Sequence, residues 1–121
     1  MSKRILIAED DPGVGDMLQL MLEEAGYDVE IQSDGSAVQQ MQRPFPDLLF
    51  LDIRLSGTDG RAICRYLKSQ KATRALPIIL LSAHKDTRQM ARECGADDFL
   101  AKPFEMGDLL ALVATYVGSG G

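Results

Sequence analysis

The strongest constraint on this chain is a regular alternation between short, wholly apolar runs and longer segments with helical periodicity. Residues 5–8, 48–51 and 78–81 are continuous apolar runs, which are typical of strands buried on both faces. The first run is followed by apolar residues at helical spacing, namely Val14, Met17, Leu18, Met21, Leu22 and Ala25. Strands that alternate with helices predict a parallel sheet with helices on both faces.

The rest of the chain continues this alternation. Asp11 and Pro12 provide an N-cap and a first helical residue, and Gly26 provides a stop, so the first helix is well delimited. The other predicted elements are a strand at 27–32, a helix at 36–42, a helix at 61–69, a helix at 87–94, a strand at 98–101 and a final helix striped by Leu109, Leu112, Val113, Tyr116 and Val117. The pattern is (βα)5, an α/β fold with a doubly wound, five-stranded parallel sheet. Right-handed crossovers leave few topologies, and we favour the flavodoxin-like strand order 2-1-3-4-5. We expect one domain at residues 1–117 and a flexible Gly/Ser tail at 118–121.

The composition limits the partners that this chain can bind. Thirteen Lys and Arg residues against eighteen Asp and Glu residues give a formal net charge of −5. A net-negative domain repels nucleic-acid phosphates and anionic membrane surfaces, so we expect neither as a direct partner. Cys64 and Cys94 belong to no CxxC motif and no Cys/His cluster, which argues against a disulfide scaffold and a zinc site.

The apolar runs are also too short for membrane insertion or secretion. None approaches the roughly 18 residues that a membrane span needs. The run at 5–8 is cut by the acidic residues that follow it, well below the usual length of a signal-peptide core. We therefore expect a cytoplasmic protein.

Polar side chains stand at the carboxyl ends of the predicted strands. Glu9 and Asp10 follow the first strand, and Asp52 follows the third. Ser82 ends the fourth strand, and Lys102 ends the fifth. Ligands of open parallel sheets bind beyond the carboxyl ends of the strands, where the strand order reverses. We expect these side chains to converge on one shallow cleft.

The acidic residues of this cleft indicate a divalent cation. Two like charges about 5 Å apart repel by roughly 3 kcal/mol at an effective dielectric constant of about 20. Asp10 and Asp52 therefore require a cation or protons nearby, whereas Asp11 is interpreted as a helix cap. Because all candidate ligands are oxygens, Mg²⁺ is the expected ion, with Mn²⁺ as a possible substitute.

The remaining groups of the cleft suit phosphoryl transfer to a carboxylate. Lys102 can pair with a phosphoryl oxygen, and Ser82 can donate a hydroxyl hydrogen bond to one. Asp52 would attack phosphorus in line while the cations neutralise charge on the transferred group. Pro103 follows Lys102, and a cis peptide bond there is expected to direct the ammonium into the cleft.

These motifs together resemble response-regulator receiver domains of two-component signalling. The resemblance covers residues 3–117 and rests on four segments: Ile5-Leu6-Ile7-Ala8-Glu9-Asp10-Asp11, Leu51-Asp52-Ile53-Arg54-Leu55-Ser56-Gly57-Thr58-Asp59-Gly60, Leu81-Ser82-Ala83-His84, and Gly95-Ala96-Asp97-Asp98-Phe99-Leu100-Ala101-Lys102-Pro103-Phe104. Ser56 departs from the family, which usually has proline before Gly57.

The resemblance implies how the cleft works. Asp52 matches the phosphoacceptor, which takes a phosphoryl group from a histidine of a sensor kinase or of a histidine phosphotransfer protein. Asp10 matches a direct Mg²⁺ ligand, Glu9 a ligand through water, and the backbone carbonyl of Arg54 the remaining protein ligand. Such a domain is a signalling phosphoacceptor, not a conventional enzyme.

The resemblance also implies a conformational switch. Ser82 matches the hydroxyl that turns toward the phosphoryl group, Lys102 the lysine that pairs with it, and Phe99 the aromatic residue that then moves inward. The output face would be the fourth helix, fifth strand and fifth helix, acting on a downstream protein or an output domain outside this sequence. Arg54 and His84 flank the site and are expected to tune the lifetime of the aspartyl phosphate.

Three other interpretations compete with a phosphorylated switch. A receiver-like module could bind partners without phosphorylation, although Asp10, Asp52, Ser82 and Lys102 form the complete set that such modules usually lack. A haloacid-dehalogenase-type phosphatase needs a second acid two residues after its nucleophile, where this chain has Arg54. A flavodoxin-like flavin carrier needs a phosphate loop after the first strand, where this chain is acidic.

Overall fold

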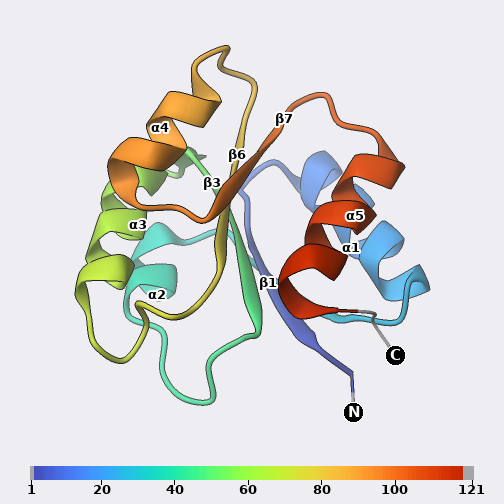
Figure 1. Cartoon of the computed structure of the whole chain (residues 1–121), viewed down its shortest axis with the longest axis horizontal. Coiled ribbons are helices and arrows are strands. Elements are labelled where there is room, and N and C mark those ends of the chain that lie inside the picture. Colours follow the sequence, from blue (N-terminus) through green and yellow to red (C-terminus); the bar gives the residue numbers. More distant parts are fainter. Residues whose placement is uncertain (1, 119–121) are drawn as a thin grey trace.

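The computed structural model describes residues 2–118 and contains one parallel sheet of five strands (Figure 1). These strands are β1 (Arg4–Ala8), β2 (Asp28–Gln32), β3 (Leu48–Asp52), β6 (Ile78–Ser82) and β7 (Asp98–Ala101). Their spatial order is β2-β1-β3-β6-β7, which confirms the predicted order 2-1-3-4-5. Residues 119–121 of the predicted tail lie outside the described residues. Gly118 accepts a hydrogen bond from the Tyr27 hydroxyl at 2.7 Å.

Helices cover both faces of this sheet (Figure 1). They are α1 (Pro12–Glu24), α2 (Gly35–Gln39), α3 (Gly60–Ser69), α4 (Thr87–Cys94) and α5 (Met106–Val117). α1 and α5 lie on one face, and α2, α3 and α4 lie on the other. In the described part of the chain, no helix combines the length and the apolar character that crossing a membrane requires.

The central strands separate two hydrophobic cores. Every residue of β3 and of β6 is buried, as their continuous apolar runs predict. Leu49 and Leu51 face the core beneath α2, α3 and α4, whereas Leu48 and Phe50 face the core beneath α1 and α5. Because side chains alternate between the faces of a strand, Asp52 at the end of β3 falls on the same side as Leu48 and Phe50.

The helix boundaries show where local sequence signals suffice and where they do not. Asp11 caps α1 by accepting the Gly13 N–H at 2.9 Å, and Gly26 adopts φ 98° just after the helix, as predicted. α2 spans Gly35–Gln39, so it begins one residue before and ends three residues before the predicted 36–42, and Met41 beyond its end packs against the core on that face.

A small hairpin that the sequence patterns did not predict follows the sheet strand β3. It pairs β4 (Arg54–Leu55) with β5 (Thr58–Asp59), and Gly57 turns between them at φ 72°. The Gly60 N–H then donates to the Ile53 carbonyl at 2.7 Å. This hairpin fixes the backbone that leaves Asp52.

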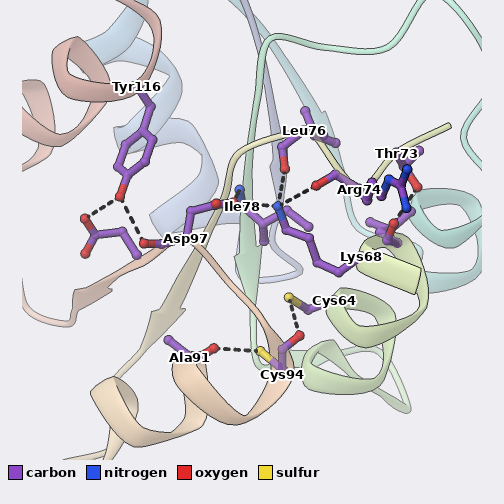
Figure 2. A network of polar contacts seen from close by, with 12 residues as sticks. Cys64, Lys68, Thr73, Arg74, Leu76, Ile78, Ala91, Cys94, Asp97 and Tyr116 are labelled. Carbon is purple, nitrogen blue, oxygen red and sulfur yellow. Dashed lines mark hydrogen bonds and ion pairs between the residues drawn. The ribbon is translucent and has the colours of Figure 1, made fainter. Parts of the chain in front are cut away.

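At the amino ends of β6 and β7, the Lys68 side chain connects the two loops that lead into these strands (Figure 2). The Lys68 ammonium donates to the Leu76 carbonyl and to Asp97 Oδ2, both at 2.7 Å. Asp97 Oδ2 also accepts the Ile78 N–H at 2.8 Å, and the Asp97 carbonyl accepts the Tyr116 hydroxyl at 2.9 Å. Through these bonds α3, α5 and the loops before β6 and β7 are held together.

The two cysteines lie in the interface between α3 and α4 (Figure 2). Both are free thiols and both are buried. The Cys64 thiol lies 3.4 Å from the Cys94 carbonyl oxygen, and the Cys94 thiol lies 3.6 Å from the Ala91 carbonyl oxygen. Both cysteines are packing residues of the core beneath α2, α3 and α4.

Gly60 is the glycine whose replacement should disturb the fold most directly. A Cβ atom there would lie 2.1 Å from the Asp52 carbonyl oxygen, which is far inside van der Waals contact. We expect Gly60→Ala to lower the free energy of unfolding by more than about 2 kcal/mol, measured by urea denaturation. Gly107 of α5 is the control, since a Cβ there meets nothing within 4 Å. Gly107→Ala should be neutral or stabilise by up to about 1 kcal/mol, and equal effects at both positions would contradict this explanation.

Candidate functional site

A polar cleft of about 740 Å³ lies beyond the carboxyl ends of β1, β3, β6 and β7. It lies where the order of the strands reverses, which is the position expected for a ligand site in such a sheet. Its lining residues are Glu9, Asp10, Asp11, Asp52, Ile53, Arg54, Arg61, Ser82, Ala83, His84, Met90 and Lys102. The structure therefore brings together all of the predicted site residues except Phe99.

Lys102 joins two buried carboxylates at the base of this cleft. Its ammonium lies 2.7 Å from Glu9 Oε1 and 2.6 Å from Asp52 Oδ2. Only 2% of Glu9 and 7% of Asp52 are exposed, so neither carboxylate has much water to stabilise its charge. The Lys102 N–H donates to the Ser82 carbonyl at 2.8 Å, and the Lys102–Pro103 peptide bond is cis, as predicted.

Asp52 is held in position by both of its oxygen atoms. Oδ1 accepts the Arg54 backbone N–H at 2.8 Å, and Oδ2 accepts the Lys102 ammonium. A carboxylate that is fixed in this way, at the base of an open cleft, presents its remaining lone pairs to an incoming group. The geometry suits a nucleophile whose approach direction is set in advance.

The charges of the site shift one another's pKa. Burial raises the pKa of Glu9 to about 7, and Asp52 adds to this shift while Lys102 opposes it. Burial also acts to raise the pKa of Asp52, but the interactions with Glu9, Lys102 and the Arg54 N–H outweigh it, so the pKa lies below its usual value. Burial acts to lower the pKa of Lys102, but the two carboxylates raise it overall. Near neutral pH, Asp52 is therefore ionised and Lys102 is charged.

Asp10 lies on the exposed side of the cleft. Its Oδ2 accepts the Ser56 hydroxyl at 3.4 Å. Asp11 is turned to the helix, where it serves as the cap that its sequence position indicated. Within residues 2–118, no three His, Cys, Asp or Glu side chains are gathered closely enough to form a metal site by themselves.

The donor chemistry of the cleft nevertheless fits magnesium. Mg²⁺ is commonly held by one or two carboxylates together with waters and substrate oxygens. Asp10 and Asp52 line the cleft and would supply the carboxylates, and the Arg54 backbone N–H lies 2.8 Å from Asp52 Oδ1. A hard cation bound by oxygen ligands is the kind of ion that this set selects.

Ser82 connects the cleft to the loop that leads into α4. Its hydroxyl oxygen accepts the His84 N–H at 2.9 Å, and 6% of the residue is exposed. His84 Nδ1 in turn accepts the Asp86 N–H at 3.1 Å, and the Thr87 hydroxyl donates to the His84 carbonyl. The loop between β6 and α4 is thus held by a series of hydrogen bonds between residues close in sequence, beginning at Ser82.

Phe99 lies away from the cleft. It stands on β7 and is half-buried against the core beneath α4. The guanidinium carbon of Arg88, on α4, lies 5.6 Å from the centroid of the Phe99 ring. Arg54 and His84, by contrast, are exposed and line the cleft, as the sequence indicated.

Four lining residues were not predicted: Ile53 and Ala83 directly follow Asp52 and Ser82, whereas Arg61 and Met90 come from α3 and α4. Arg61, in the first turn of α3, forms an ion pair at 2.9 Å with Asp59, the residue that caps this helix. An Asp followed two residues later by Arg at a helix start was the available signal. Met90 faces the cleft from α4, and no local pattern distinguishes it from a core methionine.

Known proteins share this architecture and much of this sequence. Residues 5–114 match the sequence profile of the response regulator receiver domain. The phosphate regulon transcriptional regulatory protein PhoB of Escherichia coli (strain K12) is 37% identical over 116 residues, which cover 93% of this chain and 51% of that protein. This chain spans about half the length of the curated relatives that it matches.

Two solved structures are similar over nearly the whole chain. The signal receiver domain of a signal transduction histidine kinase from Syntrophus aciditrophicus is 37% identical with a TM-score of 0.86, covering 96% of this chain and 90% of that one. The receiver domain of sensor histidine kinase PA1611 from Pseudomonas aeruginosa PAO1 is 33% identical with a TM-score of 0.87, covering 98% and 100%. That second structure holds a magnesium ion coordinated in its active site cleft.

The raised pKa of Glu9 gives the metal-free protein a characteristic pH dependence. Its value is about 7 in the fold against an ordinary value of 4.5, so neutral Glu9 is the form that the fold favours. This contribution to stability is complete below the ordinary pKa and is lost as the pH rises through the folded pKa. Between about pH 5 and about pH 8, we expect the free energy of unfolding to lose on the order of 2 kcal/mol through this group.

The measurement is urea denaturation at several pH values with a chelator present, for the wild type and for Glu9→Gln. The substitution should remove this pH dependence, because Gln keeps the shape and does not ionise. The lowered pKa of Asp52 acts in a different window, since its contribution is lost only as the pH falls below the ordinary value of 3.8. Identical pH profiles for the two proteins would show that the Glu9 assignment is wrong.

Proposed function

This chain belongs to the response regulator receiver domain family, and we propose that it is a phosphorylation-dependent switch of a two-component phosphorelay. Receiver domains are signalling modules, not conventional enzymes. In this proposal Asp52 accepts a phosphoryl group from a phosphohistidine of a sensor histidine kinase or of a histidine phosphotransfer protein. The observation that carries it is the fixed Asp52 carboxylate beside the Lys102 ammonium at 2.6 Å, in an open cleft.

The transfer needs one bond to form and one to break. A carboxylate oxygen of Asp52 forms a bond to phosphorus while the bond from phosphorus to the histidine nitrogen breaks, and the imidazole leaves with the electron pair. The Arg54 N–H and Lys102 hold the carboxylate, so that the attack follows a defined line. Lys102 then pairs with an oxygen of the transferred group, which offsets the charge that the group brings into the cleft.

Mg²⁺ is the proposed cofactor, and Mn²⁺ a possible substitute. Asp10 and Asp52 would hold it directly, with Glu9 acting through water and the Arg54 carbonyl as a further ligand. When bound, the ion supplies positive charge to the phosphoryl oxygens. The donor set supports this proposal, as does the magnesium ion in the Pseudomonas aeruginosa receiver domain.

Ser82 and Phe99 are the proposed moving parts. If the Ser82 hydroxyl turns toward the phosphoryl group, the His84 N–H loses its acceptor, and the loop before α4 is free to rearrange. Phe99 lines a groove of about 470 Å³ between β7 and α5, together with Phe104 and Leu112. A change in the ring position would alter the face formed by α4, β7 and α5, which is the surface that we propose for output.

The partners follow from this scheme. The upstream partner is a phosphohistidine protein, and the downstream partner is a protein effector or an output domain outside this sequence. We propose that residues 1–117 form the receiver unit, that it acts in the cytoplasm, and that the unit itself binds neither nucleic acid nor membrane, in keeping with its net charge of −5.

Arg54 and His84 are proposed to tune the lifetime of the aspartyl phosphate. Both are exposed side chains at the rim of the cleft, where they can affect the approach of water or of an anionic phosphodonor. Among the described residues, neither side chain forms a hydrogen bond or an ion pair with the Asp52 carboxylate, which instead bonds to the Arg54 backbone and to Lys102. Their effect would therefore be on rates, with the acceptor itself unchanged.

Phosphorylation of Asp52 is the direct test of the proposed function. With acetyl phosphate and Mg²⁺, the intact mass of the wild type should rise by one phosphoryl group, and Asp52→Asn should abolish the increase because an amide is a poor nucleophile. Asp34→Asn is the matched control, since Asp34 caps α2 away from the cleft and should leave labelling intact. Failure of acetyl phosphate and of a phosphohistidine donor to label the wild type would favour a phosphorylation-independent interaction module.

Magnesium binding is tested with neighbouring acids. Asp10→Asn should weaken Mg²⁺ binding by about tenfold or more, measured by calorimetric titration, because one charged ligand is lost. Asp11→Asn carries the same change in charge one residue away and keeps a capping side chain, so its titration should match that of the wild type. Equal weakening in both variants would indicate a general charge effect in place of a ligand at Asp10.

A further inference from the structure

The exposed face of Phe99 is covered by the side chain of Arg88. The guanidinium carbon lies 5.6 Å from the ring centroid, within the range of a cation–π contact. Phe99 is half-buried on β7, and Arg88 is an exposed residue in the first turn of α4. The two side chains thus form a contact across the boundary between an edge strand and the helix beside it.

Arg88 also stands at the end of the hydrogen-bonded loop that starts at Ser82. The Ser82 hydroxyl accepts the His84 N–H, and the His84 carbonyl accepts the Thr87 hydroxyl. Thr87 is buried and immediately precedes Arg88. A displacement of this loop at the cleft is therefore passed by the backbone to the residue that covers Phe99.

We propose that Arg88 is a positioning residue that holds Phe99 in its outer position until the Ser82 loop rearranges. This inference rests on the proposed function, because it assigns the control of the switch to a residue outside the cleft. An inward movement of the ring breaks the cation–π contact, so the contact favours the unphosphorylated arrangement. Rearrangement of the loop moves Arg88 away and releases the ring.

The size of the contact sets the expected effect. An exposed cation–π pair shifts an equilibrium between two ring positions by about two- to fivefold. Removing the guanidinium should therefore increase the population with the ring inside by that factor. If the inner arrangement accepts the phosphoryl group more readily, the rate of phosphorylation rises by the same factor.

The first experiment measures the rate of phosphorylation by acetyl phosphate. Arg88→Ala should react about two to five times faster than the wild type, and Arg88→Lys should stay near the wild-type rate because an ammonium also binds the ring face. Arg92→Ala is the matched control, since Arg92 is an exposed arginine one turn further along α4. In a Phe99→Leu background, Arg88→Ala should have no further effect.

The second experiment observes the ring in the unphosphorylated protein. All four phenylalanines are replaced biosynthetically by 4-fluorophenylalanine, and the Phe99 signal is assigned from Phe99→Leu. A neutral gadolinium chelate broadens the fluorine signals of exposed rings. If Arg88→Ala releases an inward movement, the Phe99 signal is broadened less than in the wild type. If the ring stays in place, loss of its cover exposes it, and the signal is broadened more.

These measurements separate this inference from the proposed function. Weaker broadening in Arg88→Ala, with Arg92→Ala unchanged, supports the positioning role even if no phosphodonor labels Asp52. Stronger or unchanged broadening overturns it, even if Asp52 is phosphorylated as proposed. An equal rise in rate for Arg88→Ala and Arg92→Ala also overturns it, because a general loss of positive charge would then explain the effect.

Discussion

One ammonium group shared between two buried carboxylates is the interaction on which the site depends. Glu9 and Asp52 come from neighbouring strands, and their charges would repel in a region with little water. Lys102 bonds to both, at 2.7 and 2.6 Å, so its strand end is drawn to theirs. The same ion pairs that join these strand ends also orient the Asp52 carboxylate and lower its pKa.

A lysine forms hydrogen bonds at each end of the parallel strands, and the two lysines have different kinds of partner. Lys68 at the amino ends is bonded to carbonyl groups and to Asp97, which has its own backbone donor in Ile78. The Lys102 ammonium, at the carboxyl ends, is instead bonded to two side chains that line an open cleft. Lys68 satisfies carbonyl groups of the loop before β6 and the Asp97 side chain before β7. Lys102 binds carboxylates that line the cleft, where they remain accessible to an incoming group.

The parts of this protein that could be predicted are those encoded locally. Apolar strands are followed directly by the polar residues Glu9, Asp52 and Lys102, so the sequence predicts both the strand ends and the site residues that stand there. The strand order is not local, but right-handed crossovers leave few topologies, and the order that we favoured among them is confirmed. The β4–β5 hairpin escaped prediction because its strands are too short for any periodicity to appear. Met90 in the cleft and the contact of Arg88 with Phe99 depend on how α4 is rotated about its axis, which only tertiary packing decides.

The hairpin after Asp52 is bounded by two fixed points. At one end the Asp52 side chain holds the Arg54 N–H, and at the other Gly60 packs against the Asp52 backbone and bonds to Ile53. Between these anchors, Leu55 is 2% exposed and packs into the core beneath α2, α3 and α4, and the Ser56 hydroxyl donates to Asp10, so both residues also hold the hairpin in place. The turn at Gly57, where an added Cβ would meet nothing within 4 Å, is therefore the point of the hairpin at which extra residues could be inserted with the least disturbance of the Asp52 backbone.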